Sequence, residues 1–256
     1  MALTWLILFI VVAIALAMLL WPDKGLAARW KRWRAAVERE QVEDALKVLL
    51  DHKWEGLATS SDALVAHLSL SAATVLRLVT RMEAQGLVQT RGSELALTAE
   101  GERWALQVVR AYRLWERYLA SEARMPLAQI HGEAHHLEHG LTPEQVNDLD
   151  AALGYPLRDP HGDPIPSRNG DLPVQKLALL EGLHPGQQAV VCRVDNEDPD
   201  LLRYLTTIEL VPQARITVLE RSNFDGVLRL EVGEGEVSLG PRLTGQIYVE
   251  VIQNTP

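Results

Sequence analysis

The segment that decides the fold spans residues 61–98 and reads SDALVAHLSLSAATVLRLVTRMEAQGLVQTRGSELALT. Hydroxyl and carboxyl side chains at residues 59–62 provide N-caps for a short helix that ends at Leu68. A second helix is predicted over residues 72–85, because its apolar residues recur with helical spacing and Gly86 follows as a C-terminal glycine. Two helices joined by a short turn are typical of a helix-turn-helix.

A small hairpin follows the second helix. Residues 87–90 and 95–97 are predicted strands on either side of the tight-turn sequence RGS. A further helix is predicted before the segment, over residues 38–52, and a long helix after it, over residues 99–120 with Thr98 as its cap. Three helices followed by a hairpin predict a winged helix-turn-helix.

The N-terminal residues 2–21 contain no charged side chain. A helix of this length spans about 30 Å, which is the hydrocarbon thickness of a bilayer. Basic residues begin only after the run, at Lys24, so the positive-inside rule predicts a single-pass anchor in the cell membrane with the remaining domains cytoplasmic. A cleaved signal peptide is the alternative, but it would carry its basic residues before the run. The basic stretch at residues 29–34 either binds anionic lipid or is a solvated flank of the anchor.

The formal charge of −9 is unevenly distributed along the chain. Residues 24–118 carry 15 basic and 12 acidic side chains, whereas residues 119–256 carry 10 basic and 21 acidic ones. Only the first of these parts suits a partner that bears phosphates. The single cysteine, Cys192, excludes an intramolecular disulfide and a multi-cysteine zinc site.

Residues 131–139 read HGEAHHLEH and hold half of the histidines in the chain. If they form one helix, His131, His135, Glu138 and His139 lie on one face at i, i+4, i+7 and i+8. Nitrogen and oxygen donors without thiolate suit manganese(II), iron(II), cobalt(II) or zinc(II). The other interpretation is a surface helix with solvated histidines. The string HHLEH at residues 135–139 also matches the H-x-x-E-H pattern of inverted zinc proteases, where the glutamate is a general base.

The C-terminal part has a different pattern. A helix is predicted over residues 143–153, and residues 155–171 are rich in proline, glycine and aspartate, as in a linker. Five short strands are predicted beyond residue 187, and their spacing favours a small β-barrel. The predicted fold class is therefore mainly α with a C-terminal β-barrel, preceded by a transmembrane helix.

The winged helix, followed by IHGEAHHLEH at residues 130–139 and DPHGDPIP at residues 159–166, resembles the DtxR/MntR family of iron- or manganese-dependent transcriptional repressors. The segments LLEGLHPGQQAVVCRV (residues 179–194) and LLRYLTTIELVPQARITVLE (residues 201–220) resemble the FeoA-type small barrel that often ends such proteins. The resemblance implies a homodimer that binds operator DNA and is not an enzyme, and it argues against the protease alternative.

The resemblance also implies the ligands of the metal. By position, the primary ligands would be Asp44, His135, Glu138 and His139, and an ancillary site would use Glu116 and His131. Two departures favour one metal per subunit: Tyr112 stands where the family commonly has a histidine, and Lys47 stands where manganese-type members carry a carboxylate.

For DNA, the helix-turn-helix geometry places the start of the helix over residues 72–85 in the major groove. The residues expected to contact bases are Ser71, Ala72 and Thr74, and those expected to contact phosphates are Arg77, Arg81 and Arg91.

These expectations give five parts: an anchor (1–22), a basic juxtamembrane linker (23–37), a winged helix-turn-helix (38–98), a metal-binding and dimerisation domain (99–168) and a FeoA-like barrel (169–256). The predicted function is a membrane-anchored repressor whose winged helices are docked for operator binding by iron(II) or manganese(II), with zinc(II) or cobalt(II) as other candidates. The alternative is a membrane-side metal sensor that regulates a metal transporter through the FeoA-like domain without binding DNA.

Overall fold

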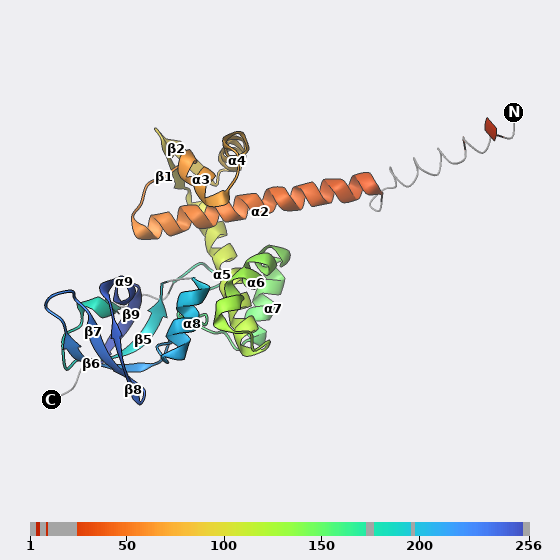
Figure 1. Ribbon diagram of the computed structural model, residues 1–256. Helices are drawn as coiled ribbons and strands as arrows, with labels where there is room; N and C mark the ends of the chain where they lie inside the picture. The colour runs from red at the N-terminus through yellow and green to blue at the C-terminus, as the bar shows by residue number, and fades with distance from the viewer. Residues whose placement is uncertain (1–3, 6–8, 10–24, 173–176, 196–197, 253–256) are drawn as a thin grey trace. The chain divides into compact units, whose positions relative to one another are not determined.

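The computed structural model describes residues 4–5, 9, 25–172, 177–195 and 198–252, which divide into two compact units, 1–105 and 106–256 (Figure 1). The predicted membrane anchor lies almost entirely outside the described residues. Within them no single helix is long and apolar enough to cross a bilayer. Only the pair Ser61–Leu68 and Ala72–Ala84, bent by 116°, reaches that length and hydropathy together.

The first unit is built on one long helix, α2, which runs from Leu26 to Glu55 between Gly25 and Gly56. The helix predicted over residues 38–52 therefore begins at Leu26, and the prediction of a linker up to residue 37 is wrong for the part beyond Gly25. The reason is local: no glycine or proline interrupts this stretch, and its alanine, arginine and lysine residues are strong helix formers. Gly56, with φ of 71°, ends the helix.

The helix-turn-helix forms as predicted from its caps. Helix α3 (Ser61–Leu68) begins where the Ser60 hydroxyl accepts a hydrogen bond from the Ala63 amide, and α4 (Ala72–Ala84) begins where Ser71 accepts one from Thr74. Strands β2 (Val88–Arg91) and β3 (Glu94–Leu97) form the hairpin of the wing, and β1 (Thr59–Ser60) pairs with β3 as a third strand. The largest fully buried side chains of this unit are Leu46, Leu50, Leu64 and Met82.

Helix α5 (Ala99–Ser121) begins at Thr98, whose hydroxyl accepts a hydrogen bond from the Gly101 amide, and it continues into the second unit. There α6 (Leu127–Leu137) is followed by a 3₁₀ turn, η1 (Glu138–Gly140), and by α7 (Pro143–Ala152). The expectation of one α-helix through residue 139 is therefore wrong. The α-helical hydrogen bonds end at Leu137, and Gly140, a poor helix former, closes the tighter turn.

The proline- and glycine-rich stretch at residues 155–171, expected to be a linker, is packed into the second unit. Asp159, His161 and Ile165 are buried there. The guanidinium of Arg113 on α5 donates to the Pro164 carbonyl and lies 3.7 Å from the Asp159 carboxylate. Polar composition predicted a loop correctly, and contacts with Arg113 on α5 help to hold this loop in the unit.

The C-terminal strands form a six-stranded sheet of order β4-β9-β5-β6-β7-β8, with antiparallel neighbours. The two short elements β4 and β8 are the edges of this order, so among the described residues the sheet is open and the expected closed barrel is not formed. One face is covered by α8, a helix that the strand pattern did not predict, whose Leu202 and Leu205 join the core of the sheet. The bounds of these elements are β4 Ala178–Leu179, η2 Leu180–Gly182, β5 Gln188–Val194, α8 Pro199–Thr207, β6 Arg215–Arg221, β7 Leu228–Val232, β8 Gly235–Leu239, α9 Pro241–Thr244 and β9 Ile247–Ile252.

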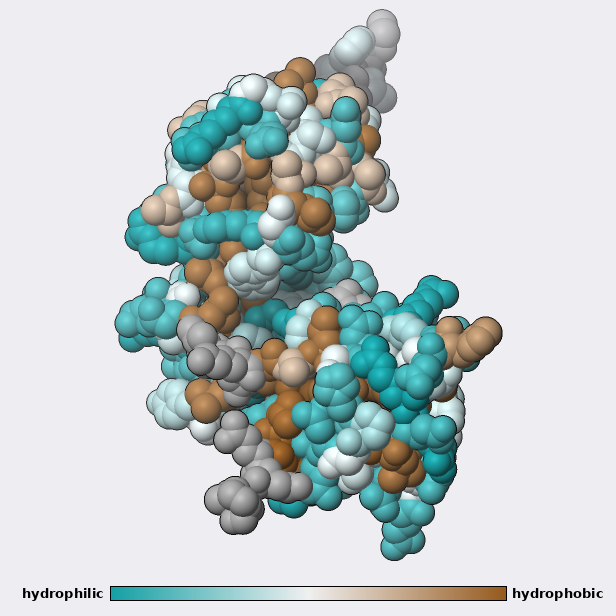
Figure 2. Space-filling model, turned by 90° about the vertical axis from the view of Figure 1, so that its left-hand side faces the viewer, coloured by the Kyte–Doolittle hydropathy of each residue, from teal (hydrophilic) through white to brown (hydrophobic). Residues whose placement is uncertain are grey.

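Helix α8 also contacts α6, so the sheet and the helix that carries the histidines belong to the same compact unit. On the face drawn in Figure 2, hydrophilic side chains cover most of the surface and hydrophobic ones show in smaller patches between them. The apolar side chains of the second unit are collected instead in three buried clusters, one in the sheet and two among α5, α6 and α7.

Candidate metal centre

The end of α6 and the 3₁₀ turn that follows bring three predicted ligands together. His135 Nδ1 lies 2.7 Å from Glu138 Oε1, and His139 Nε2 lies 3.6 Å from the same oxygen. The ligand atoms that these side chains offer lie within 4.8 Å of one another. His135, Glu138 and His139 are therefore brought together by the 3₁₀ turn and not by a continuous α-helix, and their binding of a metal stays a prediction.

The donor set fits a divalent transition metal. The Glu138 side chain has no exposed surface, that of His139 is 12% exposed and that of His135 is 46% exposed, so His135 is the most solvent-accessible of the three. A carboxylate removed from water needs positive partners, and two imidazoles beside it supply nitrogen donors. Two imidazole nitrogens and one carboxylate oxygen without sulfur suit manganese(II), iron(II) or zinc(II).

His131 is not part of this cluster, contrary to the expectation of a single face. It lies one turn earlier on α6, and its Nδ1 makes a short hydrogen bond with the hydroxyl of Tyr112 on α5. The same hydroxyl donates to Glu116 Oε1 at 2.7 Å. The predicted ancillary residues Glu116 and His131 are therefore brought together, with the Tyr112 hydroxyl in contact with both.

His161 is a member of this second cluster that the sequence analysis missed. Its Nε2 lies 3.6 Å from Glu116 Oε1, and its side chain is buried. The sequence feature that could have indicated His161 is its place in DPHGDPIP at residues 159–166, the segment that resembles the repressor family. The linker composition of residues 155–171 predicted no site there. Polar side chains from α5, α6 and this loop thus form one buried or partly buried network around Glu116.

A buried carboxyl group supports the loop that carries His161. Asp159 accepts hydrogen bonds from the His161 and Asp163 amides at 2.8 and 2.9 Å. Burial and the neighbouring charge of Asp163 raise the pKa of Asp159 to about 7, against the opposing charge of Arg113 and these amide hydrogen bonds. The loop is therefore built around a carboxyl group whose protonation changes near neutral pH.

Asp44, the fourth predicted primary ligand, lies on α2 in the first unit, between the buried residues Glu43 and Ala45. The cluster of His135, Glu138 and His139 belongs to the second unit, so the participation of Asp44 in the metal site stays a prediction. Lys47, expected beside it, follows one turn later on the same helix.

The predicted DNA contacts lie in the first unit. Ser71 caps α4, and its hydroxyl contacts that of Thr74 at 2.9 Å. Thr74 also accepts a hydrogen bond from Arg77 at 3.1 Å, so the start of α4 presents a connected polar surface. The other predicted positions, Ala72, Arg81 and Arg91, lie on α4 and at the end of β2. Whether these six residues contact DNA stays a prediction.

Two protein-family models match the second part of the chain. Residues 98–167 match the model described as iron dependent repressor, metal binding and dimerisation domain. Residues 178–251 match the FeoA domain. The first match contains the cluster of His135, Glu138 and His139, and the second contains the six-stranded sheet.

Known proteins and solved structures agree with these matches. The iron-dependent repressor IdeR of Mycobacterium leprae is 31% identical over 226 residues, which cover 83% of this chain and 98% of that protein. A solved manganese-dependent transcriptional repressor in complex with manganese aligns with a TM-score of 0.74 and 32% identity, covering 82% of this chain and 100% of the other. A shorter segment is 39% identical over 84 residues to a probable metal transport system membrane protein of Chlamydia trachomatis, covering 33% of this chain and 19% of that protein.

The relatives matched over their whole length are repressors and not enzymes, so the protease interpretation of H-x-x-E-H is wrong here. Together with the winged helix-turn-helix and the histidine–glutamate cluster, these comparisons show that the chain belongs to the DtxR/MntR family of iron- or manganese-dependent transcriptional repressors, with a C-terminal FeoA domain.

Proposed function

We propose that this chain is a membrane-anchored repressor that binds operator DNA as a homodimer when iron(II) or manganese(II) is bound by Asp44, His135, Glu138 and His139. The observation that carries the proposal is the convergence of His135, Glu138 and His139 at the end of α6, in a chain that also folds a winged helix-turn-helix. The comparisons with iron- and manganese-dependent repressors support it.

The chain's own residues suggest how metal binding would affect DNA binding. Three of the four ligands belong to the second unit and Asp44 belongs to the first. A bound divalent cation supplies the positive charge that lets the carboxylates of Asp44 and Glu138 approach each other without repulsion. Shared ligands would then fix the winged helix relative to the dimerisation domain, and so fix the spacing of two recognition helices in a dimer. By linkage, DNA binding would raise the metal affinity by the same factor.

We propose one metal ion per subunit. The Tyr112 hydroxyl contacts both Glu116 and His131, so these two ancillary residues are engaged in a hydrogen-bonded network. Neutral tyrosine is a weak ligand because its ordinary pKa is about 10. The His161 ring near Glu116 adds a further polar partner to that network.

We propose that residues 2–21 anchor the protein in the cell membrane, with the domains on the cytoplasmic side. The support is the uncharged run and the basic residues that follow it. Fractionation of cells that produce the full chain tests this point. Recovery in the membrane fraction after a high-salt wash is expected, and release as a soluble protein would contradict the anchor.

The test of the repressor uses the full chain in detergent. Random-sequence DNA is selected in parallel with manganese(II), iron(II), zinc(II) and a chelator, for the wild type and for His135→Ala. We expect recovery of a specific sequence with manganese(II) or iron(II), and loss of that recovery with chelator and in His135→Ala. His136→Ala is the matched control, because His136 is an exposed neighbour on the same helix whose ring lies outside the cluster. Selection that is indifferent to chelator and to His135→Ala would refute a metal-dependent repressor.

A second candidate is a membrane-side metal sensor that regulates a transporter and does not bind DNA. The shared segment with a probable metal transport system membrane protein motivates it, as does the presence of only two arginines on α4. It predicts metal binding by the same ligands but no sequence recovery in any arm of the selection. Recovery of one specific sequence would show that the chain binds DNA and would refute this second candidate.

A further inference from the structure

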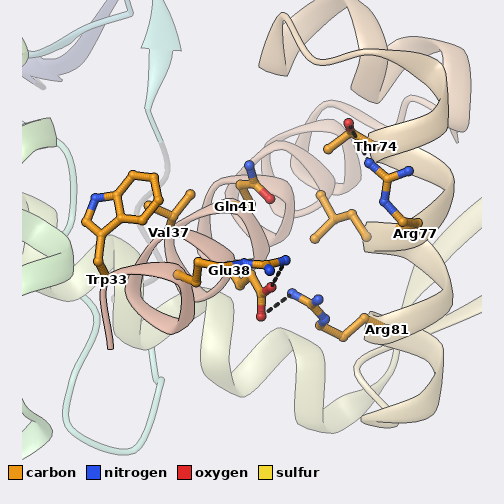
Figure 3. Close-up of a pocket in the computed structure, with 9 residues that line it drawn as sticks. Trp33, Val37, Glu38, Gln41, Thr74, Arg77 and Arg81 are labelled. Atoms are coloured by element: carbon orange, nitrogen blue, oxygen red, sulfur yellow. Dashed lines mark hydrogen bonds and ion pairs between the residues drawn. The ribbon is translucent and has the colours of Figure 1, made fainter. Parts of the chain in front are cut away.

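A groove in the first unit separates α4 from the N-terminal half of α2. Its volume is about 330 Å³, and the residues that line it come only from these two helices. Trp33, Val37 and Gln41 of α2 lie opposite Thr74 and Arg77 of α4 (Figure 3). The groove exists because α2 begins at Leu26, well before the segment that packs beneath α3 and α4.

One carboxylate connects the two sides of this groove. Glu38 of α2 lies 3.3 Å from Arg81 of α4 and 3.7 Å from Arg34, one turn earlier on its own helix (Figure 3). The side chains of all three residues are 38–55% exposed, so these ion pairs are solvated and easily exchanged for another anion. Arg77 also lines the groove, so three guanidinium groups and one carboxylate lie along it and give it a net positive charge.

The N-terminal part of α2 extends this positive surface beyond the helix-turn-helix (Figure 1). Arg34 lies 4.9 Å above the ring of Trp30, which limits the orientations of its guanidinium group. Lys31 is three residues before Arg34 and therefore lies on the same side of α2. Arg32 is two residues before Arg34 and points to the opposite side.

We infer that this groove is an additional DNA-backbone site, in which Arg34, Arg77 and Arg81 bind one phosphate group that displaces Glu38, and Lys31 binds the next phosphate along the strand. The inference rests on the proposed DNA-binding function and extends its interface from α4 to the N-terminal half of α2. Guanidinium groups in a fork geometry are well suited to phosphate oxygens. Glu38 acts as an internal counter-ion that holds the arginines in place and weakens DNA binding until a phosphate replaces it.

The position of the acidic side chain favours DNA over an anionic membrane as the occupant. The Glu38–Arg81 pair joins α2 to the predicted recognition helix, so Arg34 of α2 lies on the same groove as Thr74 and Arg77 and would face the same partner. An anionic membrane attracts basic side chains through their net charge and does not require them to lie on one side of a helix. Membrane binding would therefore depend on Arg32 about as strongly as on Lys31 and Arg34.

The test uses the full chain in detergent with manganese(II), and the duplex recovered in the selection described above as the fluorescent probe. Affinity is measured against salt for the wild type, Arg34→Gln, Lys31→Gln, Arg32→Gln, Arg77→Gln and Glu38→Gln. Loss of one phosphate contact flattens the slope of log K against log salt by about 0.9. We expect a change of about that size in Lys31→Gln, because Lys31 alone contacts its phosphate. Arg34→Gln should weaken binding with a smaller change of slope, because Arg77 and Arg81 still contact the shared phosphate. We expect no change in Arg32→Gln and several-fold tighter binding in Glu38→Gln.

The outcomes separate this inference from the function on which it rests. If Arg77→Gln weakens binding while Arg34→Gln and Lys31→Gln bind like the wild type, the repressor stands and the additional site is refuted. Equal losses in Arg32→Gln and Arg34→Gln would also refute it, because the effect would then follow net charge.

Vesicles that contain phosphatidylserine form a parallel arm with the same variants. Weaker vesicle binding in Arg34→Gln with unchanged DNA binding would assign the groove to lipid. A wild-type chain that binds no DNA in any metal overturns the proposed function and this inference together.

Discussion

The hydroxyl of Tyr112 donates a 2.7 Å hydrogen bond to Oε1 of Glu116, one turn later on α5. Both side chains are buried, and the same hydroxyl contacts the His131 ring on α6. A buried carboxylate is costly unless it has polar partners, and the Tyr112 hydroxyl and the neighbouring His161 ring supply them here. Tyr112, Glu116 and His131 therefore form a hydrogen-bonded network at the position predicted for an ancillary metal site.

Tyr112→His is expected to create a second metal site. An imidazole on α5 would join Glu116 and His131 as a nitrogen ligand, and the resulting donor set would suit manganese(II) or iron(II). Isothermal titration with manganese(II) measures the stoichiometry, which we expect to rise from one ion per chain to two.

Tyr112→Phe is the matched control for that variant. It removes only the hydroxyl, so the stoichiometry should stay at one, while the loss of a buried hydrogen bond to Glu116 should lower the free energy of unfolding by about 1–3 kcal/mol. Two ions in the wild type, or one ion in Tyr112→His when the protein is folded, would show that Tyr112 does not control the second site.

Glu138→Gln is expected to lower manganese(II) affinity by at least about tenfold. The amide keeps the size of the side chain but removes the negative charge between His135 and His139, and hard divalent cations prefer carboxylate oxygen. Glu133→Gln is the control, because Glu133 is exposed on the same helix. Titration of both variants with manganese(II) measures the effect. If Glu138→Gln binds manganese(II) as tightly as Glu133→Gln, Glu138 is not a ligand.

Much of the first unit could be predicted because its signals are local. Ser60 and Ser71 cap α3 and α4 with their own hydroxyls, and Gly86 follows α4 with a positive φ of 70°. Each of these interactions joins residues close together in the chain, so the sequence pattern contains both partners. Amphipathic periodicity predicts only the part of α2 from residue 38, because residues 26–37 have no apolar stripe and are helical through their propensity.

The second unit was harder to predict because its contacts are long-range. Residues 155–171 have the composition of a linker, but the partner that orders them, Arg113, lies on α5. His161 therefore approaches Glu116 through a tertiary contact that no local pattern contains. Closure into a barrel likewise depends on whether the edge strands β4 and β8 pair with each other. That is a long-range contact which the spacing of strands in the sequence does not contain.

Asp159→Asn is expected to change how stability depends on pH. The pKa of Asp159 is raised in the folded protein from an ordinary value of 3.8 to about 7, mainly by burial and by Asp163. Between these two values the folded state holds a proton that the unfolded state has released, so this group makes the protein less stable as the pH rises through the window. The amide of the variant does not titrate and still accepts from the His161 amide.

Urea unfolding at several pH values across this window measures the effect. The decline in the free energy of unfolding toward about pH 7 should be shallower in Asp159→Asn than in the wild type. Asp148→Asn, at an exposed position of α7, should keep the wild-type slope. Parallel curves for the wild type and Asp159→Asn would contradict a raised pKa at this position.

Gly162→Ala is expected to destabilise the second unit, by about 3–5 kcal/mol, because of backbone geometry at the loop that carries His161. Gly162 has a φ of +91°, and a Cβ atom there would lie 1.7 Å from the carbonyl oxygen of Cys192. That carbonyl lies at an irregularity in the pairing of β5 with β9, next to the hydrogen bond from the Val194 amide to the His161 carbonyl. The loop approaches the sheet so closely that only glycine fits.

Gly132→Ala provides the opposite control. This glycine lies within α6, and a Cβ atom there meets nothing within 4 Å. Alanine should therefore stabilise the helix by about 0.5–1 kcal/mol, since glycine is the poorer helix former. Thermal unfolding of both variants without metal compares the two effects directly. If Gly162→Ala unfolds at the wild-type temperature, the loop does not depend on its close contact with β5, and the position of His161 beside Glu116 would need another cause.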